Sequence, residues 1–340
     1  MSKKIFITGG LGYIGSVFAK EAVKKGYSVK LYDSLVYEQN YGKIMDDILS
    51  GKSNGGSVKL VIGDTRNIGL LEENVKKFRP DYIMHLGELS SVNTCGKNPP
   101  HTEDVNYNAS KKVIDLCEKL EIPVIYNSTS SLYGNQKEMR LMTENDPLPE
   151  PTDYYCRYKI KMEEYIKQKV NWNKKFKIIV FRPATICGLS PRMRIELLPN
   201  HFTYCAVSKG VLKISQPNSF RAIMDIKDLV NGYFAVIEKG VWKKLIYNIG
   251  HHNLSKIQVA SAIQEVAKCE VVPMSHSEDL RNLQIDCSLF NEEFDFKPSI
   301  SHEQSIRELA GWVRENLTEM EKTNFAGILN MTTEQWQRML

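Results

Sequence analysis

The sequence predicts an α/β fold built on a doubly wound parallel sheet, and two observations support that prediction. Short apolar runs alternate with segments of helical periodicity along the first half of the 340-residue chain. The first apolar run, residues 5–7, leads directly into Gly9, Gly12 and Gly15. Strands that alternate with helices build a parallel sheet with helices on both faces. The order strand, glycines, helix is typical of a turn that binds phosphate.

Each glycine of this turn has its own role in such a site. Gly9 lets the backbone bend tightly, Gly12 lets it approach a pyrophosphate, and Gly15 lets the helix pack against the strand. The first helical residues, Tyr13 and Ile14, would then present their amides to the anion. A glycine pattern of this kind also occurs in ordinary loops, so its context decides.

The context is a second strand, residues 27–32, that ends at Asp33. A carboxylate at this point can accept hydrogen bonds from both hydroxyls of an adenosine ribose. The same charge would repel a ribose phosphate. The sequence therefore predicts a dinucleotide site that favours NAD over NADP.

Composition excludes several classes of protein. A hydrophobic content of 42% excludes a disordered chain, and the net charge of +5 comes from scattered lysine pairs rather than from a basic stripe interleaved with aromatics. We therefore expect no nucleic-acid partner. The seven cysteines form no CxxC pair, which indicates reduced thiols and no metal site. The chain runs from Met1 into a strand without an apolar segment, so we expect a cytoplasmic protein with no membrane partner.

The alternation of strands and helices continues after a polar stretch that ends in SGKSNGG, residues 50–56, which we interpret as a flexible insertion. Strands are expected at residues 58–62, 82–86, 124–126 and 177–181, and helices at 68–78 and 105–120. Ligands of such sheets bind beyond the carboxyl ends of the strands. Polar residues stand there: Asp64, Arg66, Gly87, Glu88 and the run from Asn127 to Ser131. Serine and threonine at such points can equally cap the next helix.

Tyr155 and Lys159 are four residues apart in a segment that can form one helix, so they share a face. A phenol with its ordinary pKa of about 10 is a poor base at neutral pH, but a lysine ammonium and a cationic nicotinamide favour the phenolate. Tyr155 then becomes a competent general base. Tyr154 and Tyr158 show the same spacing, so the pair gains its weight from its place after the fifth strand.

Taken together, these motifs resemble the extended short-chain dehydrogenase/reductase family that acts on nucleotide sugars. The resemblance rests on TGGLGYIG, Asp33, GDTR, the STSSLYG run, Tyr155 with Lys159, and RAIMDIKD near residue 225. It implies a Rossmann-type sheet with a smaller C-terminal substrate lobe, NAD as cofactor, and a catalytic triad of Thr129, Tyr155 and Lys159. The Thr129 hydroxyl would hold the substrate oxygen whose proton Tyr155 removes, while hydride passes to the nicotinamide.

The resemblance also implies further binding residues. Besides the residues of the glycine turn, Asp33, Tyr155 and Lys159, cofactor contacts are expected from Asp64, Thr65, Leu86, Gly87 and Pro183. Substrate contacts are expected from Glu88, Ser90, Ser130, Ser131, Thr185, Arg192, Arg194, Arg221 and Arg281. Arg221 resembles the arginine that grips the nucleotide diphosphate. Surface ion pairs are an equal explanation for Arg192, Arg194 and Arg281.

The family architecture implies two units and a tail. Residues 1–181 with about 221–250 would form the NAD-binding domain, and about 182–220 with 251–315 the substrate lobe. Residues 316–340 would be a C-terminal extension, either an oligomer contact or a frayed tail. By analogy with the family, we expect a homodimer built through the helix that carries Tyr155.

Departures from the family pattern narrow the chemistry. The 4,6-dehydratases place Asp and Glu after the catalytic threonine, whereas this chain has Ser130 and Ser131. We therefore expect oxidation at carbon 4 of a nucleoside-diphosphate sugar, by a 4-epimerase or a C4 dehydrogenase of bacterial surface-polysaccharide synthesis. A 4,6-dehydratase is the alternative, followed by a non-catalytic NAD-binding protein. Glu88 replaces the usual alanine and would be a substrate ligand or a helix N-terminal charge. Thr185 replaces a common asparagine.

Overall fold

The computed structural model describes residues 2–36, 41–51, 55–136, 138–275 and 281–322. Within them, seven parallel strands form the main sheet in the order β11-β7-β5-β4-β1-β2-β3. The strands are β1 (Lys4–Thr8), β2 (Ser28–Asp33), β3 (Ser57–Ile62), β4 (Tyr82–His85), β5 (Val124–Asn127), β7 (Ile178–Pro183) and β11 (Ile246–Ile249). The strand order reverses between β1 and β4, which is where such sheets bind ligands.

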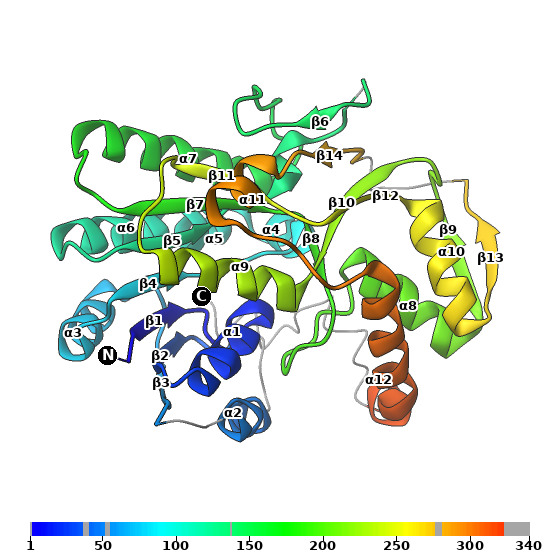
Figure 1. Cartoon of the computed structure of the whole chain (residues 1–340), viewed down its shortest axis with the longest axis horizontal. Coiled ribbons are helices and arrows are strands. Elements are labelled where there is room, and N and C mark those ends of the chain that lie inside the picture. Colours follow the sequence, from blue (N-terminus) through cyan, green and yellow to red (C-terminus); the bar gives the residue numbers. More distant parts are fainter. Residues whose placement is uncertain (1, 37–40, 52–54, 137, 276–280, 323–340) are drawn as a thin grey trace.

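Helices cover both faces of this sheet (Figure 1). One face packs against α1 (Tyr13–Lys24), α2 (Tyr41–Ser50), α9 (Ile226–Lys239) and α11 (Ser288–Phe294). The other face packs against α3 (Ile68–Phe78), α6 (Ser110–Lys119) and α7 (Tyr154–Trp172). Strand β1 shows the reason, because Ile5 and Ile7 enter one core and Phe6 the other, all without solvent exposure. The predicted doubly wound α/β fold is confirmed.

The connection from β4 to β5 is more broken than the sequence suggested. The predicted helix over 105–120 is present as the π-helical turn η1 (Asp104–Ala109) followed by α6, but two short helices, α4 (Val92–Lys97) and α5 (Pro99–Glu103), precede it. Side chains divide it: Ser91 caps α4 and Asn98 caps α5. This connection brings the residues after β4 against α7.

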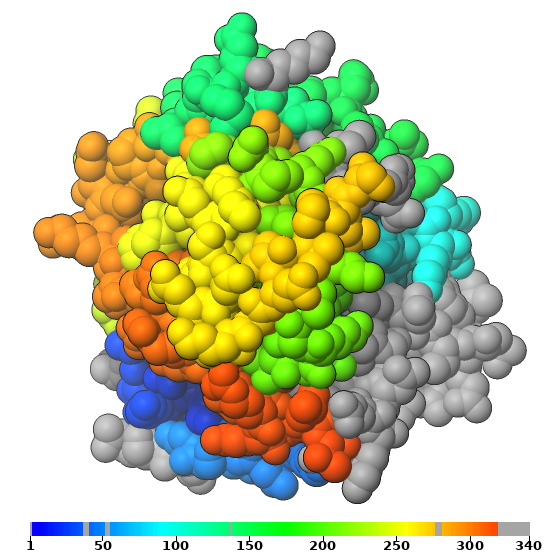
Figure 2. Space-filling model, turned by 90° about the vertical axis from the view of Figure 1, so that its right-hand side faces the viewer, coloured from blue at the N-terminus to red at the C-terminus, as the bar shows by residue number. Residues whose placement is uncertain are grey.

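A second group of elements lies to one side of the main sheet (Figure 1). It comprises β8 (Thr185–Cys187), α8 (Leu198–Lys209), β9 (Val211–Ile214), β10 (Phe220–Asp225), β12 (His252–Ser255), α10 (Lys256–Ala267), β13 (Glu270–Pro273) and α12 (His302–Lys322). Ala206, Leu212 and Ile263 belong to a separate core between these elements. In Figure 2, α8, α10 and α12 form one surface in green, yellow and orange-red. The bounds of the two units stay a prediction.

The remaining elements join the two groups. They are the 3₁₀ turn η2 (Ser130–Tyr133), β6 (Leu141–Met142) and β14 (Gln284–Ile285), and β6 pairs with β14. The polar stretch before β3 contains α2, which the sequence analysis missed; Ile44 and Ile48 of this helix are buried. Of the expected C-terminal extension, residues 316–340, the first seven belong to α12, and residues 323–340 lie outside the described residues, as do residues 52–54.

Candidate active site

A cleft of about 900 Å³ opens at the carboxyl ends of β1, β2, β4, β5 and β7. Every residue that the sequence analysis assigned to cofactor, substrate or catalysis lines this cleft. The carboxyl ends of parallel strands meet at one edge of the sheet, and this edge brings the residues together. The individual roles of these residues stay predictions. The contacts of each residue show which of these roles the geometry supports.

The glycine turn forms one wall of the cleft. Gly9 has φ +65°, and a Cβ atom there would lie 2.6 Å from the Leu86 carbonyl oxygen, so only glycine suits the position. Gly12 begins α1 without any side-chain hydrogen bond at this N-cap. The first amides of α1, those of Tyr13 and Ile14, therefore stay available for an anion. This bare helix start fits the pyrophosphate of a dinucleotide.

Asp33 stands at the end of β2, where the adenosine ribose was expected. Its Oδ2 accepts a hydrogen bond from the Leu11 amide and its Oδ1 one from the Leu35 amide, both at 2.9 Å. Burial raises the pKa of Asp33, while these two amides and the Arg192 charge act in the opposite direction. Each carboxylate oxygen keeps a lone pair for a ribose hydroxyl. The geometry thus fits an unphosphorylated ribose.

Arg192, predicted as a substrate ligand, lines the cleft near Asp33. Its charge acts on Asp33 and on Glu196, and its side chain is buried. The segment that carries it packs on the glycine turn, because Ser190 donates a hydrogen bond to the Tyr13 carbonyl oxygen at 2.7 Å. Arg192 therefore lies toward the ribose end of the cleft. Spacing along the sequence could not reveal this position, because the contact spans the two units.

Asp64 follows β3 as predicted, but it is already paired. Arg66 donates from Nη2 to Oδ2 at 2.9 Å and from Nε to Oδ1 at 3.1 Å. Burial raises the pKa of Asp64, and the Arg66 hydrogen bonds lower it by more, so the net direction is downward. Asp64 thus reaches the cofactor end of the cleft as half of an ion pair.

Thr129 and Tyr155 meet at the opposite end of the cleft. Thr129 caps η2, and its Oγ1 accepts a hydrogen bond from the Ser131 amide at 3.1 Å. Tyr155 lies in the first turn of α7, which Asp153 caps. Burial raises the pKa of the Tyr155 phenol, and the neighbouring Cys156 adds to that rise, whereas the hydrogen bond with Thr129 and the Arg194 charge lower it. The phenol therefore needs further positive charge to act as a base.

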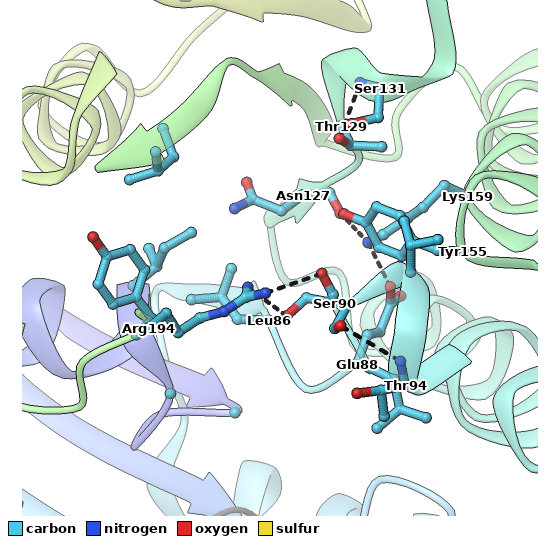
Figure 3. Close-up of a pocket in the computed structure, with 18 of the residues that line it drawn as sticks. Leu86, Glu88, Ser90, Thr94, Asn127, Thr129, Ser131, Tyr155, Lys159 and Arg194 are labelled. Atoms are coloured by element: carbon cyan, nitrogen blue, oxygen red, sulfur yellow. Dashed lines mark hydrogen bonds and ion pairs between the residues drawn. The ribbon is translucent and has the colours of Figure 1, made fainter. Parts of the chain in front are cut away.

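Lys159 lies one turn further along α7, as the sequence predicted, but its ammonium is held by other groups. Nζ lies 2.5 Å from Oε2 of Glu88 and donates to the Asn127 carbonyl oxygen (Figure 3). Glu88 was expected to bind substrate or to serve as a helix charge. The structure instead places its carboxylate against Lys159, with a side-chain exposure of 4%. Sequence reasoning missed this contact because 70 residues lie between Glu88 and Lys159 along the chain.

Arg194 reaches across the cleft toward the segment after β4 (Figure 3). Its Nη1 donates to Oγ of Ser90 at 2.9 Å, and its Nε donates to Glu196 at 2.6 Å. Arg194 and Ser90, both predicted as substrate ligands, therefore contact each other directly. Glu196 was missed, although its place two residues after Arg194 was a signal for an ion pair on a short segment.

Two further arginines meet beside η2. Arg281 donates from Nη1 to Oγ of Ser131 at 3.2 Å. Arg221, with an exposed fraction of 3%, donates from Nη1 to the carbonyl oxygens of Phe220 and Arg281. Two guanidinium groups at one end of a cleft suit a diphosphate, whose oxygens accept paired N–H bonds. Ser130 and Thr185 line the same region.

The described residues contain no group of three His, Cys, Asp or Glu side chains that could hold a metal ion. In the same part of the chain, no helix is both long and apolar enough to span a bilayer. All seven cysteines lie among the described residues as free thiols.

Comparisons with known proteins identify the family of the chain. The model of the "NAD dependent epimerase/dehydratase family" matches residues 5–250. UDP-glucose 4-epimerase 2 of Arabidopsis thaliana is 23% identical over 346 residues, which cover 93% of this chain and 96% of the relative.

Two solved structures show the same fold with different reactions. The UDP-glucose-4-epimerase of Stenotrophomonas maltophila, with bound NAD and formylated UDP-arabinopyranose, has a TM-score of 0.82 at 17% identity and covers 93% of this chain and 99% of its own. The dTDP-glucose 4,6-dehydratase of Bacillus anthracis, in complex with NAD, has a TM-score of 0.79 at 22% identity, with 93% and 97% covered. The family match spans more than half of the sequence, and the chain therefore belongs to the NAD-dependent epimerase/dehydratase family.

Proposed function

We propose that this protein uses NAD to oxidise carbon 4 of a nucleoside-diphosphate sugar, as a 4-epimerase or a C4 dehydrogenase. The observation that carries the proposal is the meeting of the Tyr155 phenol and the Thr129 hydroxyl at one end of a cleft whose other end has a bare helix start and Asp33. This arrangement places a proton acceptor and a hydroxyl donor where a sugar can approach a bound nicotinamide.

The residues have distinct roles in that reaction. The Thr129 hydroxyl holds the oxygen on carbon 4, and Tyr155 takes the proton from that oxygen as the C–H bond breaks. NAD, when bound, accepts the hydride and contributes a positive charge. In a 4-epimerase Tyr155 returns the same proton when the hydride comes back to the other face of the carbon. The Arg194 charge lowers the pKa of the phenol, and Lys159, which also lines the cleft, is proposed to add its positive charge.

The diphosphate of the substrate is proposed to lie against Arg221 and Arg281. Arg281 is tied to Ser131 and Arg221 to the backbone of Arg281, so both guanidinium groups are held in place before substrate arrives. Preorganised cations bind phosphate oxygens with little loss of side-chain entropy. The sugar would then extend from this end toward Thr129.

Water elimination is less well supported. A 4,6-dehydratase needs an acid and a base beside the catalytic threonine, and this chain has Ser130 and Ser131 there. Glu88 does not replace them, because Lys159 occupies its carboxylate. No titratable carboxyl group stands at either serine position, so the C4 reaction without elimination remains the proposal.

Further parts of the proposal rest on the family resemblance. We propose a homodimer built through α7, where Trp172 is 79% exposed, and a product that feeds bacterial surface-polysaccharide synthesis. A cytoplasmic site is supported by the seven free thiols. Light scattering after gel filtration tests the dimer directly.

The test of the reaction has two steps. A thermal-shift screen of UDP-, GDP-, CDP- and dTDP-linked sugars with NAD identifies the nucleotide sugar that stabilises the protein. That sugar is then incubated in deuterated water and its product analysed by mass spectrometry and NMR. Oxidation at carbon 4, with or without return of the hydride, gives a product whose mass shows no loss of water. A keto-deoxy product with solvent deuterium at carbon 6 would contradict the proposal.

A further inference from the structure

Glu88 forms a buried ion pair with Lys159 at the floor of the cleft. Oε2 of Glu88 and Nζ of Lys159 are 2.5 Å apart, and the two side chains are only 4% and 6% exposed. Opposite charges at this distance, shielded from water, interact strongly with each other. The pair links the segment after β4 to α7, the helix that carries Tyr155.

The rest of the Glu88 environment consists of neutral donors. Ser110 donates to Oε1 at 2.7 Å, and the Tyr126 phenol forms a hydrogen bond with the carboxylate. His85 Nε2 lies 3.6 Å from Oε1, but burial lowers the pKa of His85 to about 4, so its ring is neutral at pH 7. Burial and the Glu88 charge raise the pKa of Tyr126, which keeps that phenol protonated. Lys159 is therefore the cation that balances Glu88.

Lys159 is likewise surrounded by acceptors on this side. Besides Glu88, Nζ donates to the Asn127 carbonyl oxygen and, at 3.4 Å, to the Tyr126 hydroxyl. It also lies 4.7 Å from the centroid of the Tyr126 ring. An ammonium group has three N–H donors, and the long bond to Tyr126 is the one most easily exchanged for a cofactor hydroxyl. The other two hold the ammonium against the floor of the cleft.

We propose that Glu88 is a positioning residue that holds Lys159 in place and offsets its positive charge beside the Tyr155 phenol. A lysine with an unbalanced charge would favour the phenolate strongly. Glu88 and Lys159 together carry no net charge, so the pair favours the phenolate less than the lysine would alone. The remaining positive charge of the protein that acts on Tyr155 is that of Arg194, while Cys156 and Cys95 act in the opposite direction.

The inference rests on the proposed function in one respect, because Tyr155 must be the base. It predicts where the acid limb of the pH–rate profile lies. Removing the Glu88 charge leaves Lys159 unbalanced and should move the midpoint of this limb to lower pH. A single unit charge near an ionisable group shifts the pKa of that group, and with it such a midpoint, by on the order of one pH unit.

The main experiment compares kcat/KM from about pH 5 to about pH 10 for the wild type, Glu88→Gln and Glu88→Asp. Glu88→Gln should move the acid limb down by about one pH unit, which corresponds to about tenfold more activity below the wild-type midpoint. Glu88→Asp keeps the charge, so the midpoint of its acid limb should stay close to that of the wild type. A limb that is unchanged or moves up in Glu88→Gln would overturn the inference.

Glu163→Gln is the matched control. Glu163 is also a carboxylate that pairs with a residue of another element, Arg182, at 2.6 Å, and both side chains are 1% exposed. It lies on α7 like Lys159, one turn further along. The substitution removes an equally buried charge that is paired with Arg182 and not with Lys159. If Glu163→Gln moved the limb as far as Glu88→Gln, the effect would be structural and the inference would be wrong.

A stability cycle tests the ion pair without any turnover. Glu88→Gln and Lys159→Gln each leave one buried charge without its partner, so the double variant should lose less stability than the sum of the single variants. If the losses of unfolding free energy in urea were additive, the pairing would be overturned. If only the double variant accumulated as folded protein, while each single variant did not, the pairing would be supported. A wild type that turns over no nucleotide sugar would refute the proposed function instead, and the cycle would still decide the inference.

Discussion

Replacing Tyr155 with phenylalanine removes one oxygen atom and should abolish most of the chemical step while leaving the protein folded. The Tyr155 ring packs beside a small cluster formed by Leu89, Cys95 and Val105, and phenylalanine keeps that packing. Thr129, the partner of the lost hydroxyl, keeps another hydrogen bond, because its Oγ1 still accepts from the Ser131 amide at 3.1 Å. We therefore expect little change in thermal stability.

The size of the kinetic effect follows from the role of the phenol. General-base catalysis contributes about a hundredfold to ten-thousandfold, which equals about 2.7 to 5.4 kcal/mol of activation free energy. Tyr155 is buried, which raises the pKa of its phenol. The same burial excludes water, so a water molecule does not easily replace the lost hydroxyl as a base. The rate of hydride transfer should fall by at least the lower figure, and NAD affinity should change little.

Single-turnover absorbance of reduced nicotinamide measures the step directly, and NAD titration by calorimetry measures the affinity. Tyr158→Phe is the control: this side chain is 4% exposed, its hydroxyl donates to Glu103 at 3.4 Å, and it does not line the cleft. Full loss of turnover in Tyr158→Phe, with turnover retained in Tyr155→Phe, would refute the assignment of the base.

Three further predictions concern the cofactor site and stability. Asp33→Asn should weaken NAD binding about tenfold to a hundredfold and relax discrimination against NADP, because the carboxylate charge that binds the ribose hydroxyls and repels a ribose phosphate is lost; competitive titration with both dinucleotides checks this. Gly9→Ala should nearly abolish NAD binding in the same assay, since its Cβ would lie 2.6 Å from a carbonyl oxygen. Burial lowers the pKa of His302 from 6.5 to about 4, so the unfolded chain binds the proton first. Stability should then fall by up to about 3 kcal/mol as pH drops from about 6.5 to about 4, and His302→Asn should remove that component in urea unfolding at each pH.

The sequence predicted the first βαβ unit well because its signals are local. An apolar run, a glycine that must adopt a positive φ and a carboxylate at a strand end each act within a few residues. The helix that carries Tyr155 and Lys159 was equally readable from its spacing, and α7 contains both residues. Every residue that these patterns and the family resemblance assigned to the site lines the cleft, although other lining residues, such as Glu196, were missed.

The parts that were missed depend on contacts between distant segments. Helix α2 lies in a polar stretch, and only Ile44 and Ile48 reveal the face that packs on α1. The role of Glu88 depends on α7, and that of Arg192 on the packing of its segment against the glycine turn. Burial turns such polar residues into ion-pair partners, and a sequence shows the residue types without the burial.

The central claim is that hydride leaves carbon 4 of a nucleotide sugar. It is tested most directly with the stabilising nucleotide sugar carrying deuterium at carbon 4, with product and nicotinamide analysed by mass spectrometry and NMR in ordinary water. The account predicts a slower hydride step and deuterium found either on the nicotinamide or back on carbon 4 of the product. Deuterium that never leaves carbon 4, with normal turnover and no isotope effect, would contradict it.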